Sequence, residues 1–455
     1  MTEEKRLRWF QGVPRYAWTV LIIGALGWMF DTMDQHLFNL VRLTSLTELL
    51  TKPGVVDPTT KAQEIGPILT AIFLLGWAAG GFLFGMLGDR LGRTRTMMIT
   101  ILIYATFTGL NALVQTPWQY ALCRFLTALG VGGEFAAGAA LVAEVWPERS
   151  RPMALGLLQA LSAVGNMMAA VVTLALSAVS WRYVFVVGAI PALLVLWIRT
   201  SVKEPEQWQK AHDAAGGNKG AGEIGSIAAL FRDKKLCRNT IAGVLLATAG
   251  VGGVWGVGFF LPDLIKSALK ASFEHLPEIT ALPADAQVAA VKKALTQLAS
   301  KAFFVQNIGA FIGMIGYAAI SERVGRKPAL AGVFVLAFGA VQVAFWSLNS
   351  VAGAYALSFV VGVFCLAPFS AYAVYFPELY PTRLRATGVG FCYNCARILA
   401  AAAPFTLGKL AKEFADAGDP AIGLRKAATV IAFVYFVGVV GLMLAPETKG
   451  KPLPE

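Results

Sequence analysis

Twelve long apolar segments, separated by short charged ones, constrain this chain more than any other feature of its sequence. A helix needs about 20 mostly apolar residues to cross the hydrocarbon core of a bilayer. Such segments occur near residues 17–41, 66–88, 97–115, 118–142, 153–177, 182–200, 239–262, 301–320, 329–348, 352–376, 386–407 and 426–445. Charged residues make up only 15% of the 455 residues, whereas soluble proteins carry about 25%. The sequence therefore predicts an all-α membrane protein with twelve transmembrane helices.

Basic residues gather in the connections that follow even-numbered spans. Arg90, Arg93 and Arg95 follow the second span, and Arg323 and Arg326 follow the eighth, whereas the connections after the third and ninth spans carry no Lys or Arg. Cytoplasmic connections are enriched in these residues, so both chain ends are expected in the cytoplasm, on one side of the inner membrane. The net charge of +12 is explained by this topology, and no nucleic-acid partner is expected.

Two motifs occur twice, which indicates an internal duplication. GDRLGRTR is repeated as SERVGRKP, with Asp89 and Glu322 separated by 233 positions, and VWPERSR matches YFPELYPTR, with Pro147 and Pro377 separated by 230. The pattern predicts two pseudo-symmetric six-helix bundles, residues 1–202 and 239–455, joined by a glycine-rich, then basic, cytoplasmic linker at 203–238. A second polar segment, roughly 266–300, has helical periodicity and is expected to form a helix on the outer face.

The same motifs resemble those of a known family. GMLGDRLGRTR resembles the loop 2–3 signature of major facilitator transporters, and KEPEQW and APETKG resemble the paired PESPR and PETKG signatures of the sugar-porter branch. GVGGEFAAGAALVAEVWPERSRPMALGLLQA is most similar to the metabolite:proton and sialate:proton symporters. The resemblance implies two rocking halves with substrate bound between them. The glutamines of the sugar porters' span seven are missing from IAGVLLATAGVGGVWGVGFF, which disfavours a hexose.

Paired acidic residues in the first span are the leading candidates for proton coupling. Asp31 and Asp34 are three residues apart and share one helix face. Two carboxylates in a low-dielectric site cannot both ionise at little cost, so at least one is expected to bind the transported proton. The alternative is that one of them caps the helix or pairs permanently with Arg124.

Depth and family resemblance give different partners for Arg124. This residue lies roughly 9 Å inside span four, at a depth similar to that of Asp34, whereas the sugar porters imply that Asp31 is the partner. Both pairings stay open at this stage. Glu134 follows GVGG, whose glycines permit close helix approach, and it is predicted to be a second proton site or a partner for Arg397.

Arg397 is the leading candidate for binding substrate. A guanidinium matches a carboxylate in a bidentate manner and stays charged, so Arg397 is predicted to hold an organic anion, with Tyr393 and Asn394 orienting it. The alternative is a permanent pair with an acid of another helix. The other predicted substrate contacts, each of which could equally join helices, are Arg124, Gln159, Asn166, Gln306 and Asn307.

Charged residues at the cytoplasmic helix ends are predicted to form a gate that closes when the cavity opens outward. Ion pairs of this kind are individually weak, but a two-state interface needs only a few kcal/mol of bias to switch. The predicted gate residues are Asp89, Arg90, Arg93, Glu144 and Arg151 in the first half and Glu322, Arg323, Arg326, Glu378 and Arg385 in the second.

These patterns together predict a secondary active transporter that moves a small organic anion, such as a monocarboxylate or sialate, together with protons. The alternative is a proton-coupled or passive carrier of a sugar or another neutral metabolite. The chain has no HExxH or GxxxxGK[ST] motif, so an enzyme, an ATP-driven pump, a cofactor and a metal are not expected. The expected partners are the substrate, protons and lipid, and a monomer suffices.

Overall fold

The computed structural model describes residues 9–51, 57–176, 179–216, 224–416 and 421–455, which form α-helices joined by short 3-10 turns and loops. The first bundle consists of α1 (Arg15–Leu50), α2 (Pro58–Leu91), α3 (Arg93–Leu110), α4 (Pro117–Val145), α5 (Arg151–Ala175), α6 (Trp181–Gly188) and α7 (Ala192–Ser201). The sixth predicted span is therefore two helices, and Pro191 immediately precedes the second of them.

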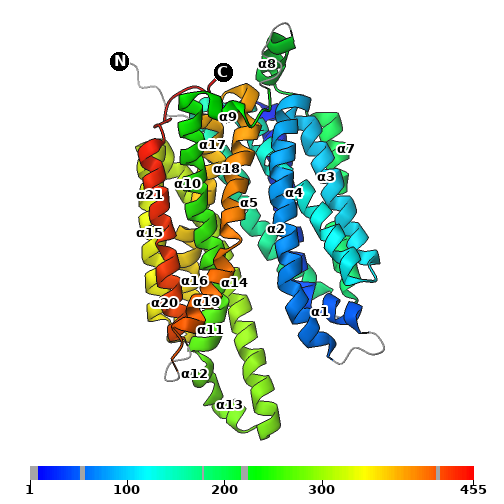
Figure 1. Cartoon of the computed structure of the whole chain (residues 1–455), viewed down its shortest axis with the longest axis vertical. Helices are drawn as coiled ribbons and strands as arrows, with labels where there is room; N and C mark the ends of the chain where they lie inside the picture. Colours follow the sequence, from blue (N-terminus) through cyan, green and yellow to red (C-terminus); the bar gives the residue numbers. More distant parts are fainter. Residues whose placement is uncertain (1–8, 52–56, 177–178, 217–223, 417–420) are drawn as a thin grey trace.

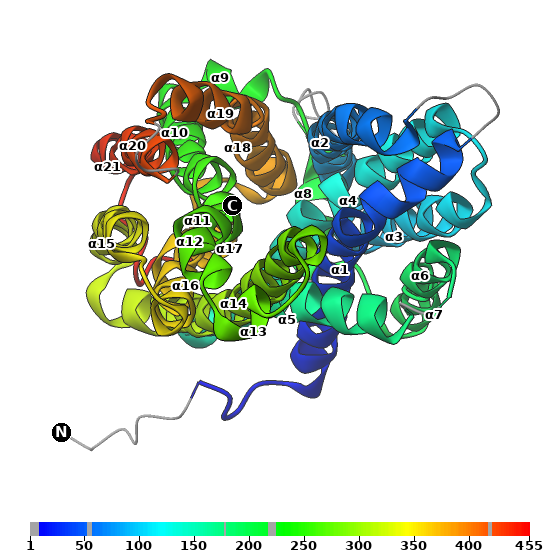
Figure 2. The same cartoon turned by 90° about the horizontal axis from the view of Figure 1, so that it is seen from below.

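The second bundle is built in the same way. Its helices are α10 (Lys234–Gly256), α14 (Ala284–Val324), α15 (Arg326–Ser347), α16 (Val351–Cys365), α17 (Ala367–Leu379), α18 (Arg385–Ala400), α19 (Ala403–Glu413), α20 (Ile422–Ala432) and α21 (Val434–Leu444). The seventh span continues from α10 through a 3-10 turn into α11 (Leu261–Ala268). Short helices outside the spans are α8 (Glu206–Gly216), α9 (Ala229–Arg232), α12 (Lys270–Glu274) and α13 (Pro277–Thr280). Figure 2 shows the two bundles side by side.

Most of the predicted spans are continuous helical stretches. Within the described residues, eleven stretches are long and apolar enough to cross a membrane. The predicted span 386–407 is not among them, and the chain turns there at Ala401 and Ala402, which divides the segment into α18 and α19. The all-helical architecture agrees with the prediction, and α18 with α19 occupies the place of the remaining span.

The polar segments differ from their predictions in two ways. A separate helix was expected within 266–300. Residues 284–300 are instead the first part of α14, which runs without a break for 41 residues, and the residues before them form the end of α11, α12 and α13. The predicted linker is helical at α8 and α9, and its residues 217–223 lie outside the described residues. Periodicity showed the helix within 284–300, but it could not show that this helix continues into a span.

The internal duplication is visible in the backbone, with one change of register. Pro147 precedes the 3-10 turn Glu148–Ser150 and then α5, and Pro381 precedes the 3-10 turn Thr382–Leu384 and then α18. Pro147 therefore corresponds to Pro381 and not to Pro377, which lies inside α17. The sequence alignment of YFPELYPTR was wrong because that motif contains two prolines.

The end of the molecule that carries these two turns is called here the basic side. It also carries Gly92 and Gly325, which separate α2 from α3 and α14 from α15 and both have φ of +107°. Only glycine adopts this conformation without strain, so the glycines of the repeated motif are explained by the sharp turn. Figure 1 places α8 and the C-terminus at this end, and α12 and α13 at the opposite end.

Small residues let the two bundles touch. A β-carbon added to Gly81 of α2 would lie 1.7 Å from Asn394 Nδ2 of α18, and one added to Gly85 would lie 3.0 Å from the Ala386 carbonyl oxygen. A β-carbon added to Gly156 of α5 would lie 2.4 Å from the β-carbon of Ala318 in α14. Such positions permit the close helix packing typical of membrane bundles, and they bring residues of α18 against the first bundle.

Candidate substrate and proton site

A sealed ion pair lies inside the first bundle. Arg124 Nη1 is 3.0 Å from Asp34 Oδ2, and both side chains are fully buried. Thr108 Oγ1 donates to Asp34 Oδ1 at 2.8 Å, while the Arg124 guanidinium lies 4.4 Å and 4.5 Å from the ring centres of Phe38 and Phe73. The partner implied by the sugar porters, Asp31, is therefore wrong for this structure, and the depth estimate is right.

Asp31 lies one turn away in a different environment. It is 1% exposed, Glu134 of α4 is 2% exposed, and the two carboxyl groups are near enough to act on each other directly. Apart from each other, the two carboxyl groups receive no hydrogen bond from the described residues. Burying a charge without a partner is costly, so two ionised carboxylates side by side at this position would be unfavourable.

Gly27 makes this arrangement possible. A β-carbon added to Gly27 of α1 would lie 1.7 Å from Glu134 Oε1. The Glu134 carboxyl group therefore occupies the space that a side chain on α1 would fill. The close approach of span four to a neighbouring helix therefore depends partly on a glycine of α1. The GVGG motif in span four did not reveal this contribution.

Arg397 lies on α18 between two aromatic rings. Its guanidinium carbon is 4.0 Å from the ring centre of Trp77 in α2 and 4.1 Å from that of Tyr393. Arg397 Nη1 donates to Asn394 Oδ1 at 2.8 Å, and no carboxylate of the described residues forms an ion pair with it. Asp31 acts on Arg397 electrostatically from a longer distance. The two residues predicted around Arg397, Tyr393 and Asn394, thus lie beside it, and Trp77 joins them.

Further aromatic side chains surround this centre. Phe135 of α4 lies 4.7 Å from Trp28 and 5.0 Å from Tyr393, measured between ring centres. The indole N–H groups of Trp28 and Trp77 find no acceptor among the described residues. Sequence reasoning missed these tryptophans, because an aromatic residue in an apolar span gives no sign of which way it faces. The centre therefore combines two acids, one cation and two free indole donors.

Of the predicted polar contacts, Asn166, Gln306 and Asn307 line a small cavity, and two of them also join the bundles. Asn166 of α5 donates to Asn307 of α14 at 2.8 Å, across the two bundles. Both line a small cavity of about 20 Å³ together with Gln306 and Phe303, which is room for about one water. Gln159 contacts Ser162 Oγ at 3.5 Å within α5.

On the basic side, the first motif forms a buried cluster that reaches into the second bundle. Arg93 Nη2 lies 3.0 Å from both Asp89 Oδ1 and Glu144 Oε1. The same Glu144 oxygen lies 2.6 Å from Arg385 Nη1 of α18. Asp89 also accepts the backbone N–H groups of residues 386 and 387, at 3.1 and 2.8 Å. Arg385 was predicted to belong to a second-half network, and it pairs across the interface instead.

The repeated motif forms a cluster within the second bundle. Arg326 Nη2 and Nε donate to the two Glu378 oxygens at 2.9 and 3.1 Å, and Thr448 Oγ1 donates to Glu378 as well. Glu322 lies near the backbone of Met153 at the start of α5. The remaining predicted gate residues form no ion pair with the acids of these clusters among the described residues. Arg90 Nε donates to the Ile224 carbonyl oxygen, and the Arg323 carbonyl oxygen accepts from Lys449 Nζ. Arg151 is buried, and its Nη2 lies 3.9 Å from Glu148.

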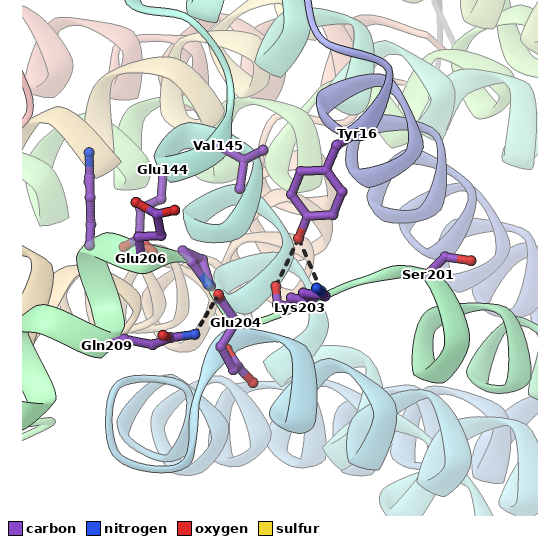
Figure 3. Close-up of a pocket in the computed structure, with 10 residues that line it drawn as sticks. Tyr16, Glu144, Val145, Ser201, Lys203, Glu204, Glu206 and Gln209 are labelled. Carbon is purple, nitrogen blue, oxygen red and sulfur yellow. Dashed lines mark hydrogen bonds between the residues drawn. The ribbon is translucent and has the colours of Figure 1, made fainter.

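Two acids that were not predicted as site residues brace these clusters. Glu204 accepts the backbone N–H groups of residues 94 and 95 at 3.2 and 3.0 Å, and Glu447 accepts those of residues 326 and 327 at 2.9 and 3.0 Å. Each therefore places a negative charge at a helix N-terminus. Figure 3 shows Glu204 in a pocket where the Tyr16 hydroxyl bonds the Lys203 backbone. KEPEQW and APETKG were the available signal, since Glu204 and Glu447 lie in them.

Comparisons with known proteins agree with this architecture. Residues 59–404 match the family model described as Major Facilitator Superfamily. A probable 4-methylmuconolactone transporter from Cupriavidus pinatubonensis is 32% identical over 93% of this chain and 89% of its own length. The sialic acid transporter NanX of Escherichia coli is 27% identical over 87% and 88%. The proton:xylose symporter XylE has the same fold, with a TM-score of 0.72, 16% identity and coverage of 96% and 98%.

The chain belongs to the Major Facilitator Superfamily. It is a multi-pass membrane transporter and not an enzyme, as the sequence predicted.

Proposed function

We propose that this protein is a symporter that carries a small organic anion together with protons. The observation that carries the proposal is the position of Arg397, a buried cation that Asp31 influences without an ion pair, while Asp31 in turn lies against a second buried acid, Glu134. Ionisable groups inside a membrane are rare and usually functional. Here the cation comes from the second bundle and the acids from the first, so the site lies where the two halves meet.

The substrate contact is a carboxylate on the Arg397 guanidinium. The rings of Trp77 and Tyr393 lie close to the guanidinium and Asn394 accepts from Nη1, so the remaining N–H groups on the edge are the ones proposed to meet a ligand. That edge binds a planar carboxylate in a bidentate manner. The names of the relatives support this class, since one is a transporter of sialic acid and another of 4-methylmuconolactone.

Proton coupling follows from charge balance. Without substrate, one proton shared by Asp31 and Glu134 leaves one negative charge to balance Arg397 at longer range. An arriving anion supplies that negative charge itself, so the two acids then take up a second proton. One anion and one proton therefore enter the site together, and neither is stable there alone, because an uncompensated charge in this environment is costly.

In the proposed alternating-access cycle the basic side is the gate. The protein lies in the inner membrane, and both chain ends lie on its cytoplasmic side. Glu144 with Arg385 and Asp89 with the start of α18 tie the halves together there. We propose that loading of the central site weakens these ties and lets the halves rock about the centre.

The test is uptake into proteoliposomes that contain a pH-sensitive dye. Monocarboxylates, sialic acid, aromatic acids and hexoses are each supplied with and without an inward proton gradient, and empty liposomes serve as the control. We expect uptake of an acid that is driven by the gradient and accompanied by acidification of the lumen. Uptake of hexoses alone, or acid uptake that ignores the gradient, would refute the proposal.

A further inference from the structure

A pocket with basic and apolar residues lies at the basic-side end of the second bundle. It lies between α9, the start of α10 and the end of α21. Its lining residues are Phe231, Arg232, Lys234, Cys237, Arg238, Ile241 and Leu444. We propose that this pocket binds the headgroup and upper acyl chain of one anionic phospholipid from the leaflet on the basic side.

The position of the pocket suits a lipid headgroup. Lys234 is the first residue of α10 and Leu444 the last of α21, and both helices are membrane spans. The pocket therefore lies at the level where the hydrocarbon core gives way to headgroups. In Figure 1, α9 and the beginning of α10 lie at the basic end of the molecule. Basic pockets between helices at this level are where anionic headgroups bind.

The charges in the pocket have one sign. Lys234 and Arg238 are four residues apart, so they project from one face of α10, and both are exposed without an ion pair to the described residues. Arg232 adds a third cation from α9. The acid in this stretch, Asp233, is occupied as the N-cap of α10 and accepts the backbone N–H groups of residues 235 and 236. A phosphate at this position meets cations and the positive end of the α10 dipole.

The rest of the pocket is apolar, which favours a lipid over a free phosphate as its ligand. Ile241 is 45% exposed and Leu444 is 36% exposed, and Phe231 is 45% exposed while its ring packs against Phe391. Ile241 lies nearly two turns deeper into the span than Lys234. An acyl chain that descends from a phosphate between Lys234 and Arg238 therefore passes over Ile241 and Leu444, where it finds the apolar contact that an inorganic ion cannot use.

The experiment measures lipid binding by the full-length chain in detergent after lipid has been stripped away. Phosphatidylglycerol is titrated and the shift in thermal unfolding temperature gives its half-saturating mole fraction. Phosphatidylcholine, glycerol phosphate and inorganic phosphate are titrated in parallel. We expect phosphatidylglycerol alone to stabilise the protein. In the double variant Lys234→Gln/Arg238→Gln, the half-saturating mole fraction of phosphatidylglycerol should rise about fivefold for each charge removed.

The matched control removes two exposed lysines elsewhere, in Lys292→Gln/Lys293→Gln. These lie on the extension of α14, roughly 48 Å along the helix from its end at Val324, beyond a hydrocarbon core of about 30 Å. This variant should bind phosphatidylglycerol like the unmodified chain. Equal weakening in both double variants would mean general charge attraction, and equal stabilisation by phosphatidylcholine or glycerol phosphate would mean that no anionic lipid site exists. Retention of phosphatidylglycerol over phosphatidylcholine in native mass spectrometry tests the unmodified chain should the pocket variant not fold.

Discussion

The two halves use the same motif at the basic side for different purposes. In both, a glycine with φ of +107° precedes an arginine that pairs with a glutamate, Arg93 with Glu144 and Arg326 with Glu378. In the first half, Glu144 also holds Arg385 of the other bundle. In the second half, both oxygens of Glu378 bind Arg326, and Thr448 of the same bundle adds to them.

This difference shows that two copies of a duplicated motif can make different contacts. Arg151 corresponds to Arg385 in the repeat, yet it lies 3.9 Å from Glu148, whereas Arg385 is 2.6 Å from Glu144. The first cluster therefore contains an ion pair between the halves, whereas the ion pair of the second cluster lies within its own half and Arg151 of the first half acts on Glu378 only at longer range. The centre shows the same asymmetry, because the first half supplies the acids and the second supplies Arg397.

The largest expected effect separates the two acids of the first half. We expect Asp34→Asn to lower the free energy of unfolding by about 3–5 kcal/mol, because it leaves Arg124 buried without its partner. Asp31→Asn should leave thermal stability nearly unchanged and abolish gradient-driven uptake. Thermal unfolding in detergent and proteoliposome uptake measure the two outcomes. Equal loss of stability in both variants would show that Asp31 has a structural partner too.

The second prediction concerns the cation of the second half. Arg397→Lys keeps the charge but loses the planar fork between Trp77 and Tyr393. We expect the rate of organic-anion uptake to fall about a hundredfold, as is typical when a buried charge-assisted contact is lost, while the unfolding temperature stays close to that of the unmodified chain. Lys409→Gln, at an exposed position of α19, is the control. Unchanged uptake in Arg397→Lys would exclude Arg397 as the substrate contact.

The third prediction tests whether only the first cluster ties the halves together. Glu144→Gln weakens a bond to Arg385, so we expect hydrogen exchange of the amides at residues 386 and 387 to rise about tenfold. Glu378→Gln should leave those amides protected and raise exchange near residues 326 and 327 instead. Exchange followed by mass spectrometry measures both segments. If Glu378→Gln exposes residues 386 and 387 as strongly, the proposed asymmetry is wrong.

The smallest expected effect concerns the brace of the second half. Partial burial opposes ionisation of Glu447, but backbone N–H groups of residues 326, 327, 448 and 449 outweigh it, so its pKa lies below the usual value. A lowered pKa in the folded state means that this stability is present above the ordinary glutamate value of about 4.3 and disappears as the pH falls through the folded-state pKa.

Glu447→Gln should therefore cost about 1 kcal/mol or less at pH 7 and should flatten the loss of stability below about pH 4.3. The measurement is the unfolding temperature from pH 7 down to pH 3. Glu278→Gln, at an exposed site on the opposite side, is the control. A pH profile of Glu447→Gln identical to that of the unmodified chain would contradict the proposed contribution of Glu447.

Much of the fold and part of the site were predictable from sequence, because they depend on local patterns. The length and apolarity of each span reflect the thickness of a bilayer, and the glycine of each basic turn reflects a backbone that other residues avoid. Arg397 with Tyr393 and Asn394 was predictable since one helical turn holds all three. The duplication was also visible, although two prolines in one motif shifted its register.

Only the tertiary structure decided which groups meet. Asp31 and Asp34 have the same chemistry and lie one turn apart, yet α3 and α4 give Asp34 a hydroxyl and a guanidinium, while α4 gives Asp31 another acid. Trp77 was not predictable as a neighbour of Arg397, nor Arg385 as the partner of Glu144, because each contact joins helices far apart in the chain. The sequence determined which charges enter the membrane, and helix packing determined which of them form ion pairs and which do not.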